Sequence, residues 1–256
     1  MQIQDQVQNI QRMISDGAQT IREHPFMQTA SDWTAGQRAR YALYQFVTAM
    51  VWPAFLSTAS AAAQNPKLKK ALRLNAAGEA GAEEGSVGHT ALAYRFCSSQ
   101  GLTDGQMVGE LTNPRFLESV GEMFAITAAG DEFMAGRLCS SEAFAGVMFE
   151  EAQPAFSQIV GCDLTYMTEH VEVDNDEHSA ALLDAIEDIL SGGGSYDEVV
   201  RGVNAGIALR RAYLEYIRVG NNPSTHTLAC GPLCSHGSRD DIKELMAEIF
   251  SSQPIE

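Results

Sequence analysis

The sequence predicts an all-α fold, a single helical bundle of about seven to nine helices that spans residues 1–256. Three observations predict it. Apolar residues recur at helical spacing along nearly the whole chain, and the alternation typical of a strand is almost absent. Hydrophobic residues make up 45% of the chain and prolines are few, which allows a sizeable core. No internal repeat or change of composition marks a second domain.

The first half of the chain is expected to contain three long helices. Helices are expected over residues 3–23 and 35–62, the second bent near Pro53. The third covers residues 66–100, and four glycines between residues 78 and 88 loosen its middle. The next helix begins with Asn113 as its cap and Pro114 at its first position, and the helix after it, from about residue 130, stops at Pro154.

The second half is expected to begin with a long helix over residues 156–190, with an interruption near Gly161. Ser195 and Glu198 have the spacing of a capping box, and the helix that they open runs to about Val219. Residues 220–238 are irregular, and a last helix starts near Arg239.

Charge and composition exclude several classes of function. The net charge of −16 argues against nucleic acid or an anionic membrane as the main partner, because both attract basic surfaces. The longest apolar stretch, residues 42–56, is short and contains Pro53, so it indicates a buried helix and not a membrane span. The N-terminal residues lack the features of a secretion signal. Five cysteines at irregular spacing fit free thiols in a reducing cytoplasm.

Residues 170–178, HVEVDNDEH, place His170, Asp174 and His178 at intervals of four. On one helix these side chains form a stripe on one face. Two imidazoles and a carboxylate suit a transition metal, and they also suit a solvated helix. The rest of the sequence has to decide between the two.

Two further segments carry acidic groups in helical surroundings. Residues 75–89 contain Glu79, Glu83, Glu84 and His89 among glycines, which indicates either a deformable ligand site or a frayed acidic helix. Glu142 lies among small and apolar residues, where an ionised carboxylate needs a metal or a salt bridge to an arginine. Three carboxylates and three imidazoles from three helices suit two iron or manganese ions better than a structural zinc.

In the order of these motifs, the chain resembles the haem-oxygenase-like di-iron oxidases and oxygenases, which are related in fold to the TenA and PqqC proteins. The resemblance rests on Asn75, Glu79, Gly81 and His89, on Glu142 before the VMF triplet, on the 170–178 stripe, and on the late helix GIALRRAYLEYI. It implies a haem-oxygenase-like bundle and six metal ligands: Glu79, His89, Glu142, His170, Asp174 and His178. Glu83 is the reserve for Glu79. No catalytic residue is expected beyond these ligands.

The resemblance also implies the cofactors and the reaction class. Two Fe(II) ions, with manganese as an alternative, would activate O2 to oxidise or cleave a small amino-acid-like or fatty-acid-like substrate, as in natural-product biosynthesis. Relatives that oxygenate amine nitrogen carry an extra carboxylate on the preceding helix, and residues 44–55 contain none. That favours cleavage of C–H or C–C bonds. A homodimer and an external electron donor are further expectations from the family.

Several assignments remain open from the sequence alone. Arg210 or Arg211 could hold an anionic substrate, and because they are adjacent on a helix only one can face inward. Tyr166 either lines the pocket or packs. Alternative functions are a metal-independent enzyme like TenA or PqqC, with Cys139 near Glu142 as a loose match to a catalytic thiol, and a non-catalytic helical binding protein. A further weak motif, a possible zinc site, consists of His226, Cys230, Cys234 and His236.

Overall fold

The computed structural model describes residues 2–82, 87–172 and 174–220, without the side chains of residues 114, 115, 118, 172 and 174–177. These ranges contain eleven α-helices and two short 3₁₀ helices: α1 (Ile3–Arg22), α2 (Pro25–Gln28), η1 (Ala30–Asp32), α3 (Ala35–Ala62), α4 (Pro66–Glu79), α5 (His89–Ser99), α6 (Asp104–Leu111), α7 (Pro114–Ala125), η2 (Ile126–Ala128), α8 (Asp131–Phe156), α9 (Thr165–Glu172), α10 (Asp174–Ser191) and α11 (Tyr196–Val219). The all-α class is confirmed, and no strand occurs in the described ranges.

The predicted count of seven to nine helices is too low. The helix expected over residues 66–100 is two helices, α4 and α5, and residues 156–190 contribute the end of α8, then α9 and α10. The short helices α2 and α6 were not predicted. Pro154 does not stop α8, which continues to Phe156. Sequence periodicity locates helical stretches well, but it does not register short breaks at glycines.

Pro53 lies inside α3 and has a consequence beyond the helix itself. Proline has no backbone N–H, so the carbonyl of Ala49, four residues earlier, loses its usual partner within the helix. The hydroxyl of Thr90 on α5 donates to that carbonyl at 2.9 Å. The carbonyl that Pro53 leaves without a partner in α3 is therefore hydrogen-bonded by α5, at the residue that follows His89, the first residue of α5.

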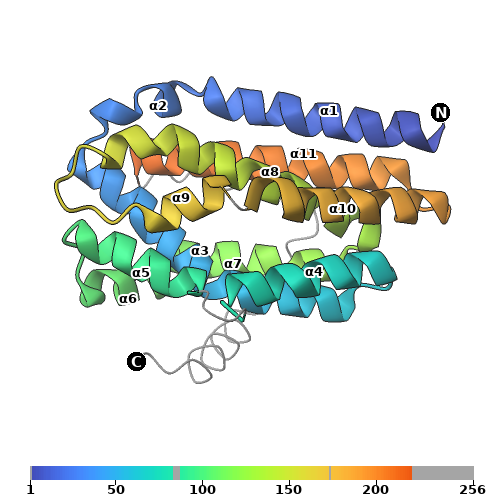
Figure 1. Ribbon diagram of the computed structural model, residues 1–256, viewed down its shortest axis with the longest axis horizontal. Helices are drawn as coiled ribbons and strands as arrows, with labels where there is room; N and C mark the ends of the chain where they lie inside the picture. Colours follow the sequence, from blue (N-terminus) through green and yellow to red (C-terminus); the bar gives the residue numbers. More distant parts are fainter. Residues whose placement is uncertain (1, 83–86, 173, 221–256) are drawn as a thin grey trace.

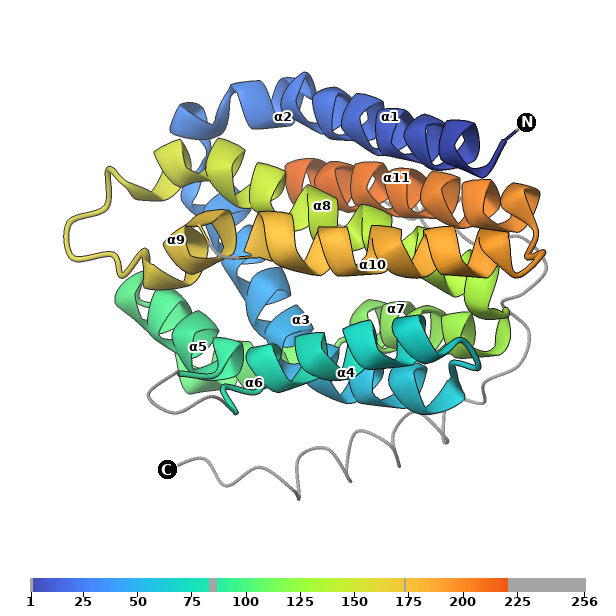
Figure 2. The same cartoon turned by 45° about the vertical axis from the view of Figure 1, so that its right-hand side comes forward.

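The helices form three layers (Figures 1 and 2). α1 lies along one side of the bundle and packs on α8, α10 and α11, which form the middle layer. α3, α4, α5 and α7 form the opposite layer, where α3 packs against the other three. α8 is central, because it packs against α1, α9, α10 and α11. Side chains that point inward from α4, α8 and α9 therefore meet between the middle layer and the opposite layer.

α8 and α11 approach each other unusually closely because small residues face each other. Gly202 on α11 lies against the backbone of Phe133 and Arg137 on α8, and Gly206, four residues later, lies against Ser140. Gly136 on α8 in turn lies against the backbone of Val199 on α11. A Cβ added to Gly202 would lie 2.8 Å from the backbone nitrogen of Arg137 and nearer still to the carbonyl oxygen of Phe133. This spacing of small residues lets two helix backbones touch.

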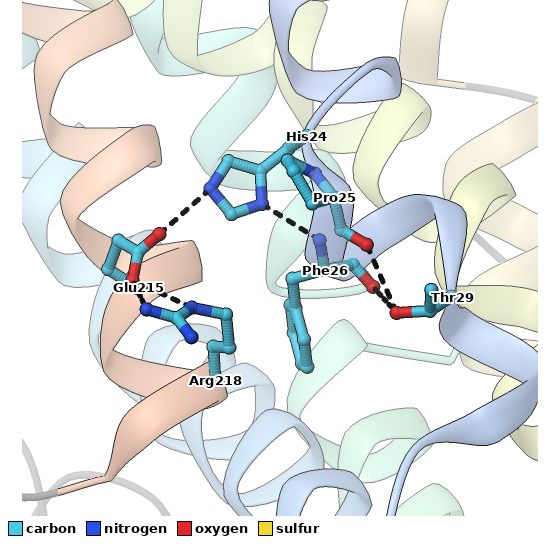
Figure 3. Close-up of polar contacts among 6 residues, drawn as sticks. All are labelled: His24, Pro25, Phe26, Thr29, Glu215 and Arg218. Carbon is cyan, nitrogen blue, oxygen red and sulfur yellow. Dashed lines mark hydrogen bonds and ion pairs between the residues drawn. The ribbon is translucent and has the colours of Figure 1, made fainter.

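The corner between α1 and α2 is tied to α11 (Figure 3). His24 caps α2, and its Nδ1 accepts a hydrogen bond from the backbone N–H of Phe26 at 3.3 Å. Its Nε2 lies 3.3 Å from Oε1 of Glu215, whose other oxygen, Oε2, accepts two hydrogen bonds from Arg218. The N-terminal segment is thus anchored to the last described helix. No described helix has both the length and the apolar character required to span a membrane.

Candidate metal centre

α4 ends directly after Glu79 because of Gly81. The N–H of Ala82 bonds the carbonyl of Ala77, and the N–H of Gly81 bonds the carbonyl of Gly78, both at 2.9 Å. This pair of bonds is the Schellman motif, which requires a left-handed residue just past the helix. Gly81 supplies it with φ of +68°. Glu79 is therefore the last residue of α4, at the point where the chain turns away.

The chain returns to the same point at Gly88. A Cβ added to Gly81 would lie 2.8 Å from the Cα of Gly88, and a Cβ on Gly88 would lie 2.9 Å from the carbonyl oxygen of Ala80. Only two glycines allow this approach of backbones. It brings His89, the first residue of α5, back to Glu79, and the His89 Nδ1 lies 2.8 Å from the Glu79 Oε2.

His170 completes a compact set of three donors. Its donor atom and those of Glu79 and His89 all lie within 4.8 Å of one another, and the three side chains are buried. The Nδ1 of His170 lies 2.7 Å from the backbone carbonyl oxygen of Tyr166, so this nitrogen carries the proton and donates. In a neutral imidazole protonated at Nδ1 the lone pair is on Nε2, which is the usual tautomer of a metal-binding histidine.

Glu142 faces the same space from α8. It is buried, and its Oε1 accepts a hydrogen bond at 3.0 Å from the Nδ2 of Asn75, one turn before Glu79 on α4. Glu79, Glu142 and His170 line one small cavity of about 40 Å³. That volume exceeds the roughly 10–15 Å³ that a single water needs.

The remaining predicted ligands are placed less fully. His178 lies on α10 and not on the helix of His170, so the stripe expected on one helix extends over α9 and α10. The His178 Nε2 would lie 3.9 Å from a Cβ added to Gly78, so this imidazole approaches the end of α4. The side chain of Asp174 and the whole of the reserve residue Glu83 lie outside the described residues.

The electrostatics of Glu79 favour an ionised carboxylate. Burial alone would raise the pKa of Glu79, but the hydrogen bond and charge of His89, together with the charges of His170 and His178, outweigh burial and lower this pKa. A buried anion among three imidazoles is the type of donor set that binds a cation.

Two residues predicted to contact substrate also border the small cavity, Tyr166 and Arg210. Tyr166 is buried and both lines the cavity and packs on Phe149, with ring centroids 5.3 Å apart. Arg210 is half-buried, whereas the adjacent Arg211 is exposed. The Nη2 of Arg210 donates to the backbone carbonyl of Ser141 at 3.3 Å.

Sequence reasoning assigned no role to several residues at the centre. Asn75, quoted only as part of a motif, holds Glu142. Thr48 and Ser141 also line the small cavity. Thr48 is a polar residue within an otherwise apolar helix sequence, which is the signal that could have found it, whereas Ser141 lies between Ser140 and Glu142 and carries no such signal. The weak zinc motif, His226 to His236, lies outside the described residues.

Cys139, the candidate thiol of a metal-free enzyme, is buried. Burial, with the charge of Glu142 added to it, raises its pKa to about 12. A thiol with this pKa is protonated at neutral pH and is a poor nucleophile.

The donor set fits iron. Mixed carboxylate and imidazole ligands with open positions are typical of non-haem iron sites, whereas a structural zinc prefers cysteine and histidine in a closed tetrahedron. The hydrogen bonds of His170 and Glu142 to groups outside the donor set provide the orientation that such ligands require.

Comparison with known proteins places the chain. Residues 39–211 match the sequence model of a family described as iron-containing redox enzymes. The crystal structure of a TenA homolog from Pseudomonas syringae pv. tomato is similar in fold, with a TM-score of 0.58 and 12% sequence identity over 82% of this chain and 91% of that one. No curated protein sequence matches the chain. The family match spans more than half of the chain and includes Glu79, His89, Glu142 and His170, so the chain belongs to this family of iron-containing redox enzymes.

Proposed function

We propose that the protein is a non-haem di-iron oxidase or oxygenase that uses O2 to oxidise or cleave a small amino-acid-like or fatty-acid-like substrate. The observation that carries this proposal is the convergence of Glu79, His89 and His170, from three helices, to within 4.8 Å in a buried position. Membership of a family of iron-containing redox enzymes supports it.

The ligands divide into two groups in this proposal. Glu79, His89 and His170 hold one ion, and Glu142, His178 and Asp174 complete the second position. Bound iron would supply the O2 reduction and substrate oxidation that side chains cannot perform alone. The protein's own residues orient and shield the site. Asn75 fixes the carboxylate of Glu142, and the Tyr166 carbonyl fixes the His170 ring.

Aromatic side chains limit the access of water to this site. The rings of Phe149 and Tyr166 lie 4.4 Å and 4.5 Å from the His170 ring, measured between centroids. Both side chains are buried. An aromatic wall lowers the local polarity and so strengthens the electrostatic interactions of the metal ligands.

The alternatives are less well supported. A non-catalytic binding protein would direct its acidic and imidazole groups to solvent, but Glu79, His89, Glu142 and His170 are all buried. A TenA-like hydrolase that uses Cys139 would need a thiolate, and the pKa of about 12 disfavours one.

Anaerobic titration with Fe(II), followed by metal analysis of the dialysed protein, tests the proposal. We expect two iron ions per chain in the wild type and at most one in Glu79→Gln, in which the charged ligand is lost. Glu169→Gln is the matched control, because Glu169 is exposed next to His170 and its variant should bind iron as the wild type does. Consumption of O2 by the iron-loaded wild type then tests the redox activity. Wild-type protein that binds no iron would refute the proposal.

A further inference from the structure

A second and larger cavity lies between α3, α7, α8 and α11. Its volume is about 520 Å³, within the roughly 300–1,000 Å³ of small-molecule sites. Its wall is mainly apolar, and the principal apolar side chains are Val51, Trp52, Phe116, Val120, Met123 and Leu209. None of the metal ligands discussed above lines this cavity, so it offers a binding space for a substrate and not for the metal.

The large cavity adjoins the candidate metal centre. Four residues line both cavities, and we refer to them as the junction: Thr48, Trp52, Ser141 and Arg210. A molecule in the large cavity that contacts the junction therefore touches residues that also border the small cavity at the metal ligands. The small cavity, at about 40 Å³, has no room for a chain of several carbon atoms.

Arg210 is the cation of the junction, and it has free hydrogen-bonding capacity. Its Nε is buried and has no hydrogen-bond partner among the described residues, and no described carboxylate forms an ion pair with it. The other two arginines of the large cavity are already engaged. Arg137 donates to the hydroxyl of Ser141, and Arg201 pairs with Glu198. A guanidinium with a buried unsatisfied N–H favours an anionic ligand.

We propose that the large cavity binds a carboxylic acid with a long apolar chain, the carboxylate at Arg210 and the chain among the side chains of α3 and α7. This assignment of substrate class rests on the proposed function. The carbons next to the carboxylate then lie nearest to the metal ligands, and the far end of the chain lies farthest from them. In a chain with a net charge of −16, a local guanidinium is needed to hold an anion.

An α-amino acid fits the junction less well. Its ammonium group, one carbon from the carboxylate, would need an acceptor of negative charge close to Arg210. None of the four junction residues is acidic, and the two carboxylates that line the small cavity together with Arg210, those of Glu79 and Glu142, are metal ligands in the proposed function. Among the described residues that line the large cavity the one carboxylate is that of Glu122, on α7. The ammonium would instead lie near a guanidinium, which repels it.

Isothermal titration calorimetry with decanoate on the full-length protein tests the assignment. We expect saturable binding, weakened about tenfold or more in Arg210→Gln because a charge-assisted hydrogen bond is lost. Arg211→Gln is the matched control: it removes the same charge from the adjacent, exposed position and should leave the affinity unchanged. Decanol, which has the chain without the carboxylate, should bind the wild type as weakly as decanoate binds Arg210→Gln.

A second variant tests the apolar wall and does not depend on the folding of Arg210→Gln. Ala205 on α11 lines the large cavity, and Ala205→Phe should fill part of it and weaken decanoate binding about tenfold. Circular dichroism of each variant confirms that the helices are retained. Equal binding of decanol and decanoate, or equal loss in the two arginine variants, would overturn the proposal.

The result of the calorimetry can be distinguished from the result of the iron titration. Binding of leucine without binding of decanoate would overturn the substrate class, while iron uptake would still support the di-iron function. Binding of decanoate that depends on Arg210, in a protein that takes up no iron, would support the ligand class and refute the proposed function.

Discussion

Replacing Gly202 by alanine tests whether the close contact between α8 and α11 is essential to the bundle. The added Cβ would lie 2.8 Å from the backbone nitrogen of Arg137 and still nearer to the carbonyl oxygen of Phe133, whereas ordinary van der Waals contact begins at 3.4 Å. The two helices must therefore separate by at least about 0.6 Å. Both obstructing atoms belong to a helix backbone, so no side-chain rotation can relieve the contact.

The expected cost follows from two opposing contributions. Overpacking of this kind lowers the free energy of unfolding by about 1–3 kcal/mol, and a rigid helix pair belongs in the upper part of that range. Alanine in place of glycine within a helix raises the free energy of unfolding by about 1 kcal/mol. The net loss for Gly202→Ala is therefore about 1–2 kcal/mol.

Gly109→Ala is the matched control. Gly109 lies on α6, and no atom would lie within 4 Å of its added Cβ. The free energy of unfolding of this variant should therefore rise by up to about 1 kcal/mol. Urea unfolding, followed by far-ultraviolet circular dichroism, measures the free energies of the wild type and both variants. If Gly202→Ala is as stable as the wild type, or gains as much as Gly109→Ala, the reasoning about the helix contact is wrong.

Three further predictions concern a helix cap, a histidine and a thiol. Asn65 caps α4 by accepting from two backbone N–H groups, so Asn65→Ala should lower the free energy of unfolding by about 1 kcal/mol; an unchanged urea midpoint would contradict this. Burial, although opposed by Glu215, lowers the pKa of His24. The neutral imidazole therefore contributes stability that is complete above about pH 6.5 and is lost as the pH falls towards the lowered pKa. The stability of the wild type should decline more steeply below pH 6.5 than that of His24→Gln, and equal slopes would argue against the shift. The pKa of Cys139, raised to about 12, predicts that iodoacetamide labels this thiol only after unfolding, which mass spectrometry of its peptide can check; rapid labelling of the native protein would disprove it.

Local chemistry explains which helix boundaries could be predicted from the sequence. Ser195 accepts from the N–H of Glu198 at the start of α11, as its spacing predicted, and α7 begins at Pro114 as expected. Caps and N-terminal prolines act within a few residues, so a sequence displays them directly. The break after Glu79 was missed, because glycines there were interpreted as loosening a continuous helix. A glycine just past a helix is a local signal of its end, but four glycines lie between residues 78 and 88, and the sequence does not show that Gly81 is the one that ends α4.

The candidate site was predictable in composition but not in arrangement. Glu79, His89 and His170 were named from residue types and order, and the structure brings their donor atoms together. The position of Glu79 relative to His89 could not be predicted, because one continuous helix was expected over residues 66–100 and the two residues lie on different helices. The large cavity could not be predicted, because its wall comes from α3, α7, α8 and α11, which are far apart in the sequence. The close contact of α8 and α11 could not be predicted either, because the spacing of Gly202 and Gly206 by four residues has this meaning only once the partner helix is known.

The glycine turn between α4 and α5 also bears on the order in which the site assembles during folding. Glu79 and His89 are separated by 10 positions, whereas Asn75 and Glu142 are separated by 67. Loop-closure entropy favours the shorter connection by about 1.7 kcal/mol. The Glu79–His89 pair therefore has the lower entropic barrier, and we expect it to form before α8 brings Glu142 into place. A partly folded chain would already offer two adjacent donors to a metal ion. Metal present during synthesis would therefore bind before the bundle closes. Because the metal then binds the partly folded state as well, it stabilises the native state by a smaller amount.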